Sequence, residues 1–358
     1  MMTEKDRNIW MDGMMGLVTG DALGCPVQFC TRQEIAKRPQ GPVTGMEGFG
    51  TYDMPPGTWT DDSSMALAVL ESIRRTGGID PDDIMENFIR WEYDGAFTPF
   101  GYAFDEGRTC VGAIVRYHAE RDWRTCGKTG DHANGNGALM RILPVCLYCY
   151  EKQQTGAEAD TGTTVLSEAK AASMYDAATM PKSAAGAGPM SDAEAVRAIH
   201  EVSALTHNHL RSQIACGLYY FMVKAILDGK GDLIARLQEG IDMGWAYYRR
   251  DVRNLTELAY YGRIRSLSDF RKLPADAIRS TGYVVDSLEA AVWSLITTES
   301  LEECLLKAVN LGDDSDTVGA IAGGLAGLYY GYASIPEAWL EAIQKREQVE
   351  SLISVLHR

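Results

Sequence analysis

The sequence predicts an all-α fold, and three observations support this prediction. Apolar residues recur at three- and four-residue spacing along most of the 358 positions, which is the period of a helix with one buried face. Alternating apolar and polar runs, the pattern of half-buried strands, are scarce. Two apolar segments also carry glycine at every fourth position, which places these glycines on one face of a helix.

Eleven helices are expected, each from its apolar periodicity. In chain order they cover residues 8–24, 62–76, 81–92, 111–120, 138–152, 193–204, 209–228, 231–248, 284–296, 301–310 and 316–332. The second shows the pattern clearly, because Met65, Val69 and Ile73 lie four residues apart and Gly77 follows its end.

The first and last of these helices carry the glycine stripes, at Gly16, Gly20 and Gly24 and at Gly319, Gly323, Gly327 and Gly331. Glycine inside a helix costs about 1 kcal/mol relative to alanine, so a repeated stripe needs compensation. Close approach of the glycine backbone to another helix or to a ligand would compensate this cost, and a helix–helix contact is favoured for most of these glycines. We therefore expect both helices near the centre of the molecule, in a crowded contact.

One domain is expected over residues 1–358, interrupted by a low-complexity insertion at about 153–191 that is rich in Thr, Ala, Gly and Ser. A short helix around Ser167–Tyr175 is expected within the insertion. The mixed segment 249–283 is expected to hold one or two short helices.

Composition excludes some functions. The formal charge of −15, from 49 acidic and 34 basic side chains, argues against non-specific nucleic-acid binding, which needs cations. No secretory signal or membrane span is visible, so we expect a cytoplasmic protein with no membrane partner. Eight scattered cysteines with a single CxxC, Cys146 to Cys149, fit buried thiols better than zinc.

Two acidic clusters far apart in the chain suggest a metal site. They are Gly57-Thr-Trp-Thr-Asp-Asp-Ser63 and Gly312-Asp-Asp-Ser-Asp-Thr317, each at the expected start of a helix. Hydroxyl and carboxylate oxygens without sulfur or imidazole are the donors that Mg²⁺, Mn²⁺ or Ca²⁺ select. If the fold joins the clusters, they can hold one or two divalent cations.

Two other interpretations compete with the metal site. Thr and Asp are good N-caps, and acidic first turns suit the helix dipole, so capping could account for either cluster. It accounts less well for two matched clusters. An EF-hand starting at Asp314 fails, because its fifth and twelfth positions are Val318 and Leu325, where oxygen ligands are required.

Four ordered motifs carry a family resemblance. They are Gly20-Asp-Ala-Leu-Gly24, the first acidic cluster, Gly135-Asn-Gly-Ala-Leu-Met-Arg141 and Gly312-Asp-Asp-Ser-Asp-Thr-Val-Gly319. In this order they resemble the ADP-ribosylglycohydrolase family, over residues from about 10 to about 335. The resemblance implies a compact orthogonal bundle of many helices and a centre of two divalent cations, Mg²⁺ or Mn²⁺. The ligands it implies are Thr60, Asp61, Asp62, Asp314, Asp316 and Thr317.

The resemblance also implies a catalytic carboxylate. Phe104-Asp-Glu-Gly-Arg-Thr109 is similar to a Phe-Asp-x-Gly-x-Thr segment whose Asp is catalytic, so Asp105 is expected to transfer the proton, with Thr109 near the substrate. A solvated surface acid is the alternative for Asp105. Many relatives carry glutamate where this chain has Gln28, and that glutamate is catalytic in the serine-specific ones. Because an amide cannot transfer the proton, Gln28 shifts the expectation toward Asp105.

The remaining implied residues would bind the substrate. The run Asn134, Gly135, Asn136, Gly137 precedes the helix expected at 138–152, where free N–H groups would face the diphosphate of ADP-ribose. His207 matches a substrate-contacting histidine, and Tyr283 matches a position that stacks on adenine. The alternative for residues 134–137 is an ordinary turn, and the alternative for His207 and Tyr283 is that both are core residues.

The function implied is metal-dependent hydrolysis of mono-ADP-ribose from a protein side chain, with arginine favoured. The partners expected are an ADP-ribosylated protein as substrate and ADP-ribose as product, and the enzyme is expected to be a monomer. Two alternatives stay open. One is hydrolysis of a threonine, serine, O-acetyl-ADP-ribose or nucleic-acid linkage, and the other is a non-catalytic ADP-ribose-binding member.

Overall fold

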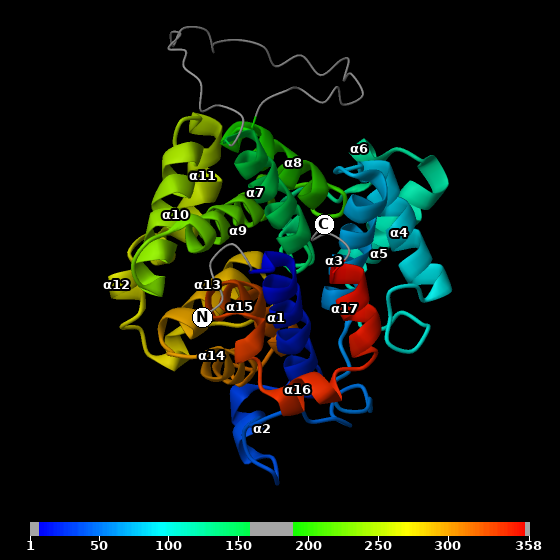
Figure 1. Ribbon diagram of the computed structural model, residues 1–358, viewed down its shortest axis with the longest axis vertical. Helices are drawn as coiled ribbons and strands as arrows, with labels where there is room; N and C mark the ends of the chain where they lie inside the picture. The colour runs from blue at the N-terminus through cyan, green and yellow to red at the C-terminus, as the bar shows by residue number, and fades with distance from the viewer. Residues whose placement is uncertain (1–6, 158–188, 355–358) are drawn as a thin grey trace, which may run out of the picture.

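The computed structural model describes residues 7–157 and 189–354 (Figure 1). Over these ranges the chain forms seventeen α-helices, and its only β-pairing there is three isolated bridges. The prediction of an all-α fold is confirmed. Among the described helices, none is both long and apolar enough to cross a bilayer.

All eleven expected helices are present, most of them within three residues of the predicted ends. They are α1 (Ile9–Gly24), α3 (Asp61–Thr76), α4 (Pro81–Asp94), α5 (Arg108–Glu120), α7 (Leu143–Ala157), α8 (Asp192–Ala204), α9 (Leu210–Asp228), α10 (Leu233–Tyr248), α13 (Val284–Ile296), α14 (Leu301–Val309) and α15 (Ser315–Tyr330). The other six are short: α2 (Arg32–Lys37), α6 (Trp123–Cys126), α11 (Leu255–Leu258), α12 (Leu267–Phe270), α16 (Glu337–Ala342) and α17 (Arg346–Ser354). Of these, α11 and α12 lie in segment 249–283, as expected.

The helix predicted at 138–152 is wrong at both ends. Residues 138–142 form turns, because the carbonyl of Asn136 accepts hydrogen bonds from the N–H groups of Leu139 and Met140, at 2.7 and 3.1 Å. Helix α7 then starts at Leu143 and continues to Ala157, into the segment predicted to be loose. The helix expected around 167–175 lies outside the described residues.

Helices α1 and α15 form the antiparallel pair at the centre of the molecule (Figure 1). A Cβ on Gly20 would lie 2.0 Å from the carbonyl oxygen of Gly319, and one on Gly16 would lie 2.2 Å from that of Gly323. The two backbones are therefore in direct contact, and any side chain here would separate the helices. The glycine stripes do mark a crowded helix contact, except that Gly331 lies just beyond the end of α15.

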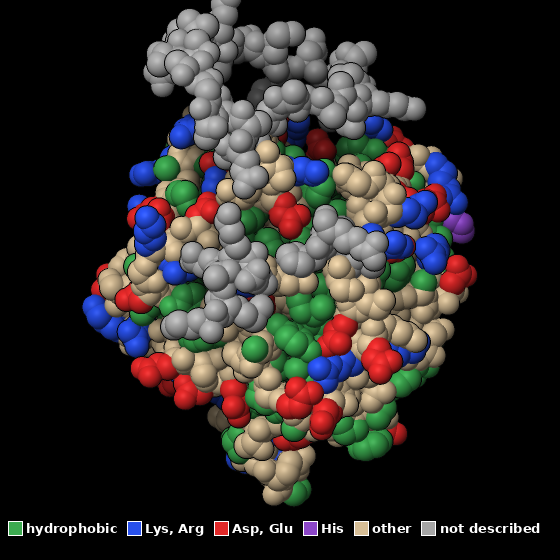
Figure 2. Space-filling model, in the orientation of Figure 1, with side chains coloured by type: hydrophobic (Ala, Val, Ile, Leu, Met, Phe, Trp, Pro, Cys, Tyr) green, Lys and Arg blue, Asp and Glu red, His purple; other side chains and the backbone are tan. Residues whose placement is uncertain are grey.

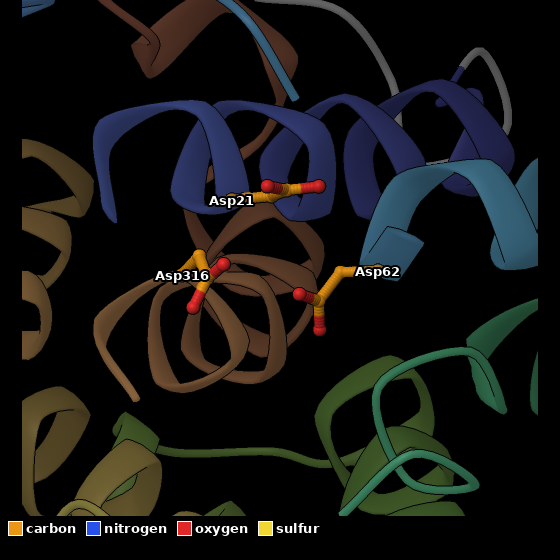
Figure 3. Close-up of side chains that lie close together, drawn as sticks. All are labelled: Asp21, Asp62 and Asp316. Carbon is orange, nitrogen blue, oxygen red and sulfur yellow. The ribbon is translucent and has the colours of Figure 1, made fainter. Parts of the chain in front are cut away.

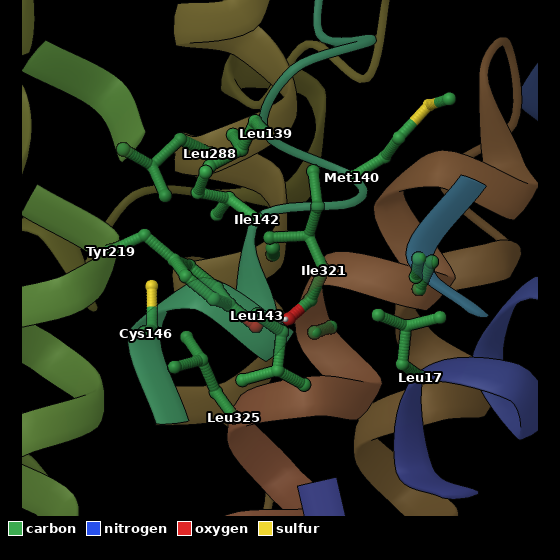
Figure 4. Close-up of a cluster of buried hydrophobic side chains, with 14 of the residues drawn as sticks. Leu17, Leu139, Met140, Ile142, Leu143, Cys146, Tyr219, Leu288, Ile321 and Leu325 are labelled. Atoms are coloured by element: carbon green, nitrogen blue, oxygen red, sulfur yellow. Dashed lines mark hydrogen bonds between the residues drawn. The ribbon is translucent and has the colours of Figure 1, made fainter. Parts of the chain in front are cut away.

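The core surrounds this pair. Helices α9, α13 and α14 pack against α15, while α3 and α7 contact α1. Figure 4 shows the apolar side chains that fill the space between α7, α9, α13 and α15. Within it, the buried Tyr219 hydroxyl donates a hydrogen bond to the carbonyl of Ile321, at 3.2 Å, which satisfies the polar end of its ring.

The acidic residues at the ends of the central helices come together because of this packing. Gly24 lies against the backbone of Asp316, so the C-terminal part of α1 faces the first turn of α15. Helix α3 begins beside both, with Thr60 as its N-cap and Gly77 in the left-handed conformation (φ 70°) as its C-cap. Three helix termini therefore meet at one buried place.

Candidate metal centre

The two acidic clusters meet in the structure. Asp62 from α3 and Asp316 from α15 lie beside Asp21 from α1, with one oxygen of each within 4.8 Å of the others (Figure 3). A direct contact also joins the clusters, since the Thr317 hydroxyl donates to Asp62 Oδ2 at 3.3 Å. All four side chains are buried.

Asp21 was not among the residues predicted for the site. Its carboxylate accepts from the N–H groups of Thr60 and Ser63, both at 3.0 Å, and from their hydroxyls at 3.0 and 2.5 Å. Both of its oxygens are thus committed to donors of the α3 N-terminus. Asp21 therefore orients the first turn of α3, and its sequence signal was its place in the Gly20–Gly24 motif.

The N-terminus of α3 carries both a capping residue, Thr60, and two carboxyl groups that capping does not require. The Thr60 hydroxyl accepts from the N–H of Asp62, as an N-cap does, and lies 3.1 Å from Asp62 Oδ2. Asp61 is 6% exposed beside it. The capping interpretation is correct for Thr60, but it leaves the carboxyl groups of Asp61 and Asp62 unexplained.

Asp314 lies at the more open side of the centre, between two amides. Asn136 donates to its Oδ2 at 2.7 Å and Gln28 Nε2 approaches its Oδ1 at 3.5 Å. Gln28 is 5% exposed, so its amide lies inside the site.

Buried oxygens without donors indicate that the centre suits a cation. Asp62 Oδ1, Asp316 Oδ2, Asp105 Oδ2 and Gln28 Oε1 are buried and accept no hydrogen bond from the described residues. Such an unpaired buried acceptor costs about 1–3 kcal/mol, and native structures contain few of them. Hard oxygens gathered in this way fit a divalent cation such as Mg²⁺ or Mn²⁺.

The carboxyl groups are perturbed as their burial predicts. Desolvation, followed by repulsion from neighbouring carboxylates, raises the pKa of Asp61, Asp62 and Asp316 well above the usual value. Desolvation also raises the pKa of Asp21 to about 7, although the hydrogen bonds from Ser63 and Thr60 act in the opposite direction and lower this pKa. Positive charge placed among these groups would favour their ionised forms.

Asp105 lies at this centre and not on the solvated surface. Its charge contributes to the raised pKa of Asp61 and of Asp316, which places it beside both clusters. The Tyr52 hydroxyl donates to its Oδ1, and Oδ2 has no hydrogen-bond partner within the described parts of the chain. Burial raises the pKa of Asp105 to about 6, close to the range in which a group can both give and take a proton.

The Asn134–Gly137 segment lies in a turn and not at a helix N-terminus. Asn134 and Asn136 pair with the 282–284 segment, since Val284 N–H donates to the Asn134 carbonyl at 2.9 Å and Asn136 N–H to the Gly282 carbonyl at 3.1 Å. Gly135 forms an isolated bridge with Tyr283. The expected anion site at a following helix is therefore displaced, because α7 starts only at Leu143.

His207 is packed beneath this turn. A Cβ on Gly137 would lie 2.9 Å from its Cε1, and its Nδ1 lies 2.8 Å from the Thr206 hydroxyl. Burial, followed by the charge of Arg141, lowers the pKa of His207 to about 3, so its imidazole is neutral. Arg141 donates to the carbonyl of Gly137 and to Thr206 at 2.9 Å, which ties the turn to the histidine.

Tyr283 pairs with the Asn134–Gly137 turn through its bridge to Gly135, whereas Thr109 is placed only by its element. Tyr283 is half-buried and its hydroxyl accepts from Arg211 at 3.2 Å, while Arg211 pairs with Glu257 at 2.7 Å and stacks over Tyr260 at 3.6 Å. Tyr283 was predicted from the sequence, whereas its neighbours Arg211, Glu257 and Tyr260 were not, because none of these three belongs to a recognisable motif. Thr109 lies in the first turn of α5, four positions after Asp105.

These observations define an all-α protein with a buried centre of carboxylates, gathered from three helix termini and suited to divalent cations. The chain belongs to the ADP-ribosylglycohydrolase family, whose model matches residues 2–174 and 153–358. Members of this family use divalent metal ions.

Two named relatives and one solved structure are similar to this chain over nearly its whole length, in agreement with its membership of the family. An ADP-ribosyl-[dinitrogen reductase] glycohydrolase of Rhodospirillum rubrum is 30% identical over 96% of this chain and 95% of its own. An ADP-ribosylarginine hydrolase, Tri1 of Serratia proteamaculans, is 28% identical over 96% of this chain and 77% of its own. An ADP-ribosylglycohydrolase-related protein superposes with a TM-score of 0.68 at 27% identity, over 98% of this chain and 97% of that one.

Proposed function

We propose that this protein is a metal-dependent hydrolase that removes mono-ADP-ribose from arginine side chains of proteins by cleaving the N-glycosidic bond. The observation that carries the proposal is Asp105, whose free oxygen lies beside two joined carboxylate clusters. The names of the Serratia and Rhodospirillum relatives support the substrate class. Substrate is an ADP-ribosylated protein and product is ADP-ribose.

Two cations, Mg²⁺ or Mn²⁺, fit the buried oxygens. The residues proposed to hold them are Thr60, Asp61, Asp62, Asp314, Asp316 and Thr317. When bound, the cations would fix the 2′- and 3′-hydroxyls of the distal ribose and lower the pKa of bound water. Asp21 keeps Thr60 in place, and Asn136 does the same for Asp314.

Asp105 is the proposed acid and base. The hydroxyl of Tyr52 occupies Oδ1, so the exchangeable proton resides on Oδ2, which accepts no hydrogen bond from the described residues. Asp105 gives this proton to the departing guanidine nitrogen and takes one back from the attacking water. The carboxylates around C1″ stabilise the oxocarbenium character that develops as the bond breaks.

The substrate-binding roles rest on position. The turn Asn134, Gly135, Asn136, Gly137 would border the diphosphate, with neutral His207 beneath it, and Tyr283 would stack on adenine. Thr109 would face the ribose from the first turn of α5. We propose one domain over residues 1–358, because motif residues from both sides of segment 153–191 meet at this centre.

The proposal also includes a cellular compartment, an oligomeric state and an alternative function. Seven of the eight cysteines are buried and all eight are free thiols, which supports a reducing cytoplasm. A monomer suffices, since all the proposed site residues come from one chain. A different linkage, such as threonine, serine, O-acetyl-ADP-ribose or nucleic acid, is the alternative, and Gln28 is the feature that favours a merely binding protein.

The test compares arginine-, serine- and threonine-linked ADP-ribosyl peptides, with Mg²⁺, with Mn²⁺ and with EDTA. Release of ADP-ribose from the arginine peptide, lost in EDTA, is the expected result. Asp105→Asn should bind ADP-ribose normally and lose about 10²–10⁴-fold in turnover, whereas Gln28→Glu should add little. Near-normal turnover by Asp105→Asn, or activity appearing only in Gln28→Glu, would contradict the assignment.

A further inference from the structure

Five aromatic side chains form a continuous strip beside Asp105. The ring centroids of Phe29 and Tyr52 are 6.5 Å apart, and those of Tyr52 and Phe104 are 5.4 Å apart. The contacts continue from Phe104 to Tyr102 at 6.5 Å and from Tyr102 to Phe100 at 6.3 Å. We call these five residues the aromatic strip.

The strip reaches the catalytic carboxylate at one point and the solvent at its ends. Tyr52 donates its hydroxyl hydrogen bond to Asp105, so its ring borders the proposed leaving-group side of the site. The two end rings, Phe29 and Phe100, are 65% and 36% exposed, and Tyr102 beside Phe100 is 49% exposed. A connected set of exposed aromatic rings is unusual away from binding surfaces.

The backbone that presents the strip is strained. Phe29 has a φ of 64° and Asp105 a φ of 63°, in the left-handed region that bulky residues avoid. Nearby loops repeat this at Phe49, Asp53 and Phe97, with φ between 54° and 61°. Strain of this kind costs about 1–3 kcal/mol per residue and gathers at functional sites. Within the strip itself the strained residue is Phe29, whose exposed ring is therefore held in place at an energetic cost.

Two acidic residues, Glu92 and Glu106, interact electrostatically, and Glu106 is close in sequence to Asp105. Glu106 follows Asp105 and is exposed, and it contributes to the raised pKa of Glu92, for which burial is the larger cause. Glu92 Oε2 is buried without a hydrogen-bond partner among the described residues. Arg108 is the nearby cation in sequence. Glu106 lies two positions after Phe104, and an acidic residue close in the chain to aromatic rings suits a cation that can stack.

We propose that the aromatic strip binds the guanidinium group and adjoining chain of the ADP-ribosylated arginine, and so selects arginine over hydroxyl-linked substrates. This inference rests on the function proposed above. A guanidinium is planar, always charged and stacks on aromatic faces, at about 0.5–2 kcal/mol per contact. Serine and threonine linkages have neither the charge nor the planar group that this stacking requires.

The test uses two side-chain probes of the same shape, Nα-acetyl-arginine amide and its citrulline counterpart, in which a neutral urea replaces the guanidinium. Each is titrated into the full chain with Mg²⁺ and saturating ADP-ribose. The arginine probe should bind and the citrulline probe should bind more weakly. Phe29→Leu and Tyr102→Leu should each weaken arginine-probe binding about threefold to thirtyfold.

Controls separate stacking from a general change in the loops. Phe49→Leu removes a ring that is 67% exposed but has no ring contact with the strip among the described residues, and it should leave probe binding unchanged. Tyr102→Phe should retain it. Glu106→Gln should weaken the arginine probe and not the citrulline probe. None of these variants should change ADP-ribose affinity by more than about twofold.

The outcomes are distinguishable from those of the proposed function. If wild-type protein hydrolyses arginine-linked peptide while Phe29→Leu and Tyr102→Leu keep its KM and the probe affinity, the strip proposal is wrong and the function stands. If no linkage to arginine is cleaved but the probe binds through the strip, the function is wrong and the guanidinium site stands. Equal binding of the arginine and citrulline probes would overturn the strip proposal.

Discussion

Asp21→Asn should weaken metal binding although Asp21 itself need not touch a cation. In the structure its two oxygens accept four hydrogen bonds from Thr60 and Ser63. An asparagine keeps one oxygen, so the bonds from Thr60 can remain. Its amide nitrogen faces the N–H of Ser63, which loses its acceptor in a buried place.

The magnitude follows from that lost contact. A buried N–H without an acceptor costs about 1–3 kcal/mol, and Ser63 can relieve it only by moving the first turn of α3. That turn carries Asp61 and Asp62. Loss of a group that orients metal ligands typically costs about 10–100-fold in metal affinity. At saturating metal, this removes about 1.4–2.7 kcal/mol of metal-induced stabilisation.

The assay is calorimetric titration with Mn²⁺ together with thermal unfolding in Mg²⁺ and in EDTA. Asp12→Asn is the matched control, because Asp12 is also a buried aspartate of α1 and accepts from the N–H of Tyr332 at 2.6 Å. It lies nine residues, or about 13 Å, before Asp21. Wild-type Mn²⁺ affinity in Asp21→Asn, or a loss no larger than in Asp12→Asn, would refute the reasoning.

The remaining predictions concern the ligands, pH and the central helices. Asp316→Ala should abolish metal binding in metal analysis yet leave helical content by circular dichroism, and metal-free stability should hardly fall, because carboxylate repulsion is relieved. The raised pKa of Asp21 (about 7) and Asp105 (about 6) means that their stabilisation of the metal-free protein is full below about pH 4 and is lost as pH rises through these values. The difference in melting temperature between Mg²⁺ and EDTA should therefore grow from pH 5.5 to 8, and a constant difference would contradict this. Gly20→Ala should destabilise by about 3 kcal/mol in urea unfolding, since its Cβ would lie 2.0 Å from a carbonyl oxygen, whereas Gly112→Ala, with nothing nearer than 3.6 Å, should stabilise by about 0.5–1 kcal/mol.

The helices were predictable because the spacing of apolar residues along the chain matches the faces that the helices bury in the core. Helices such as Val284–Ile296 were found to the residue, because apolar spacing and length agree. The start of α7 was missed for a physical reason. Residues 138–142 are apolar at helical spacing, but Arg141 among them is fully buried and bonds the Gly137 carbonyl, which favours a turn.

The site was predictable where the chemistry is unusual in sequence. Adjacent carboxylates such as Asp61 and Asp62 are conspicuous, because they repel unless something compensates them. Asp21 was missed although it lies in the Gly20–Gly24 motif, because its role comes from contacts with Thr60 and Ser63 that are distant in sequence. Tyr52 was missed because it has ordinary neighbours and acquires its role only from a tertiary contact. Tyr52 orients Asp105 across 53 positions of sequence, and no local pattern records such a contact.

The glycine contact and the carboxylate centre depend on each other. Because glycine has no side chain, α1 and α15 approach so closely that Gly24 contacts the first turn of α15. This proximity brings Asp21 beside Asp316. Without a cation, the same proximity buries mutually repelling carboxylates, which is unfavourable. The tight helix pair supplies the packing energy that holds them together, so the proposed metal affinity should depend partly on glycines that contact no metal. Loosening the pair should therefore lower metal affinity before it unfolds the chain.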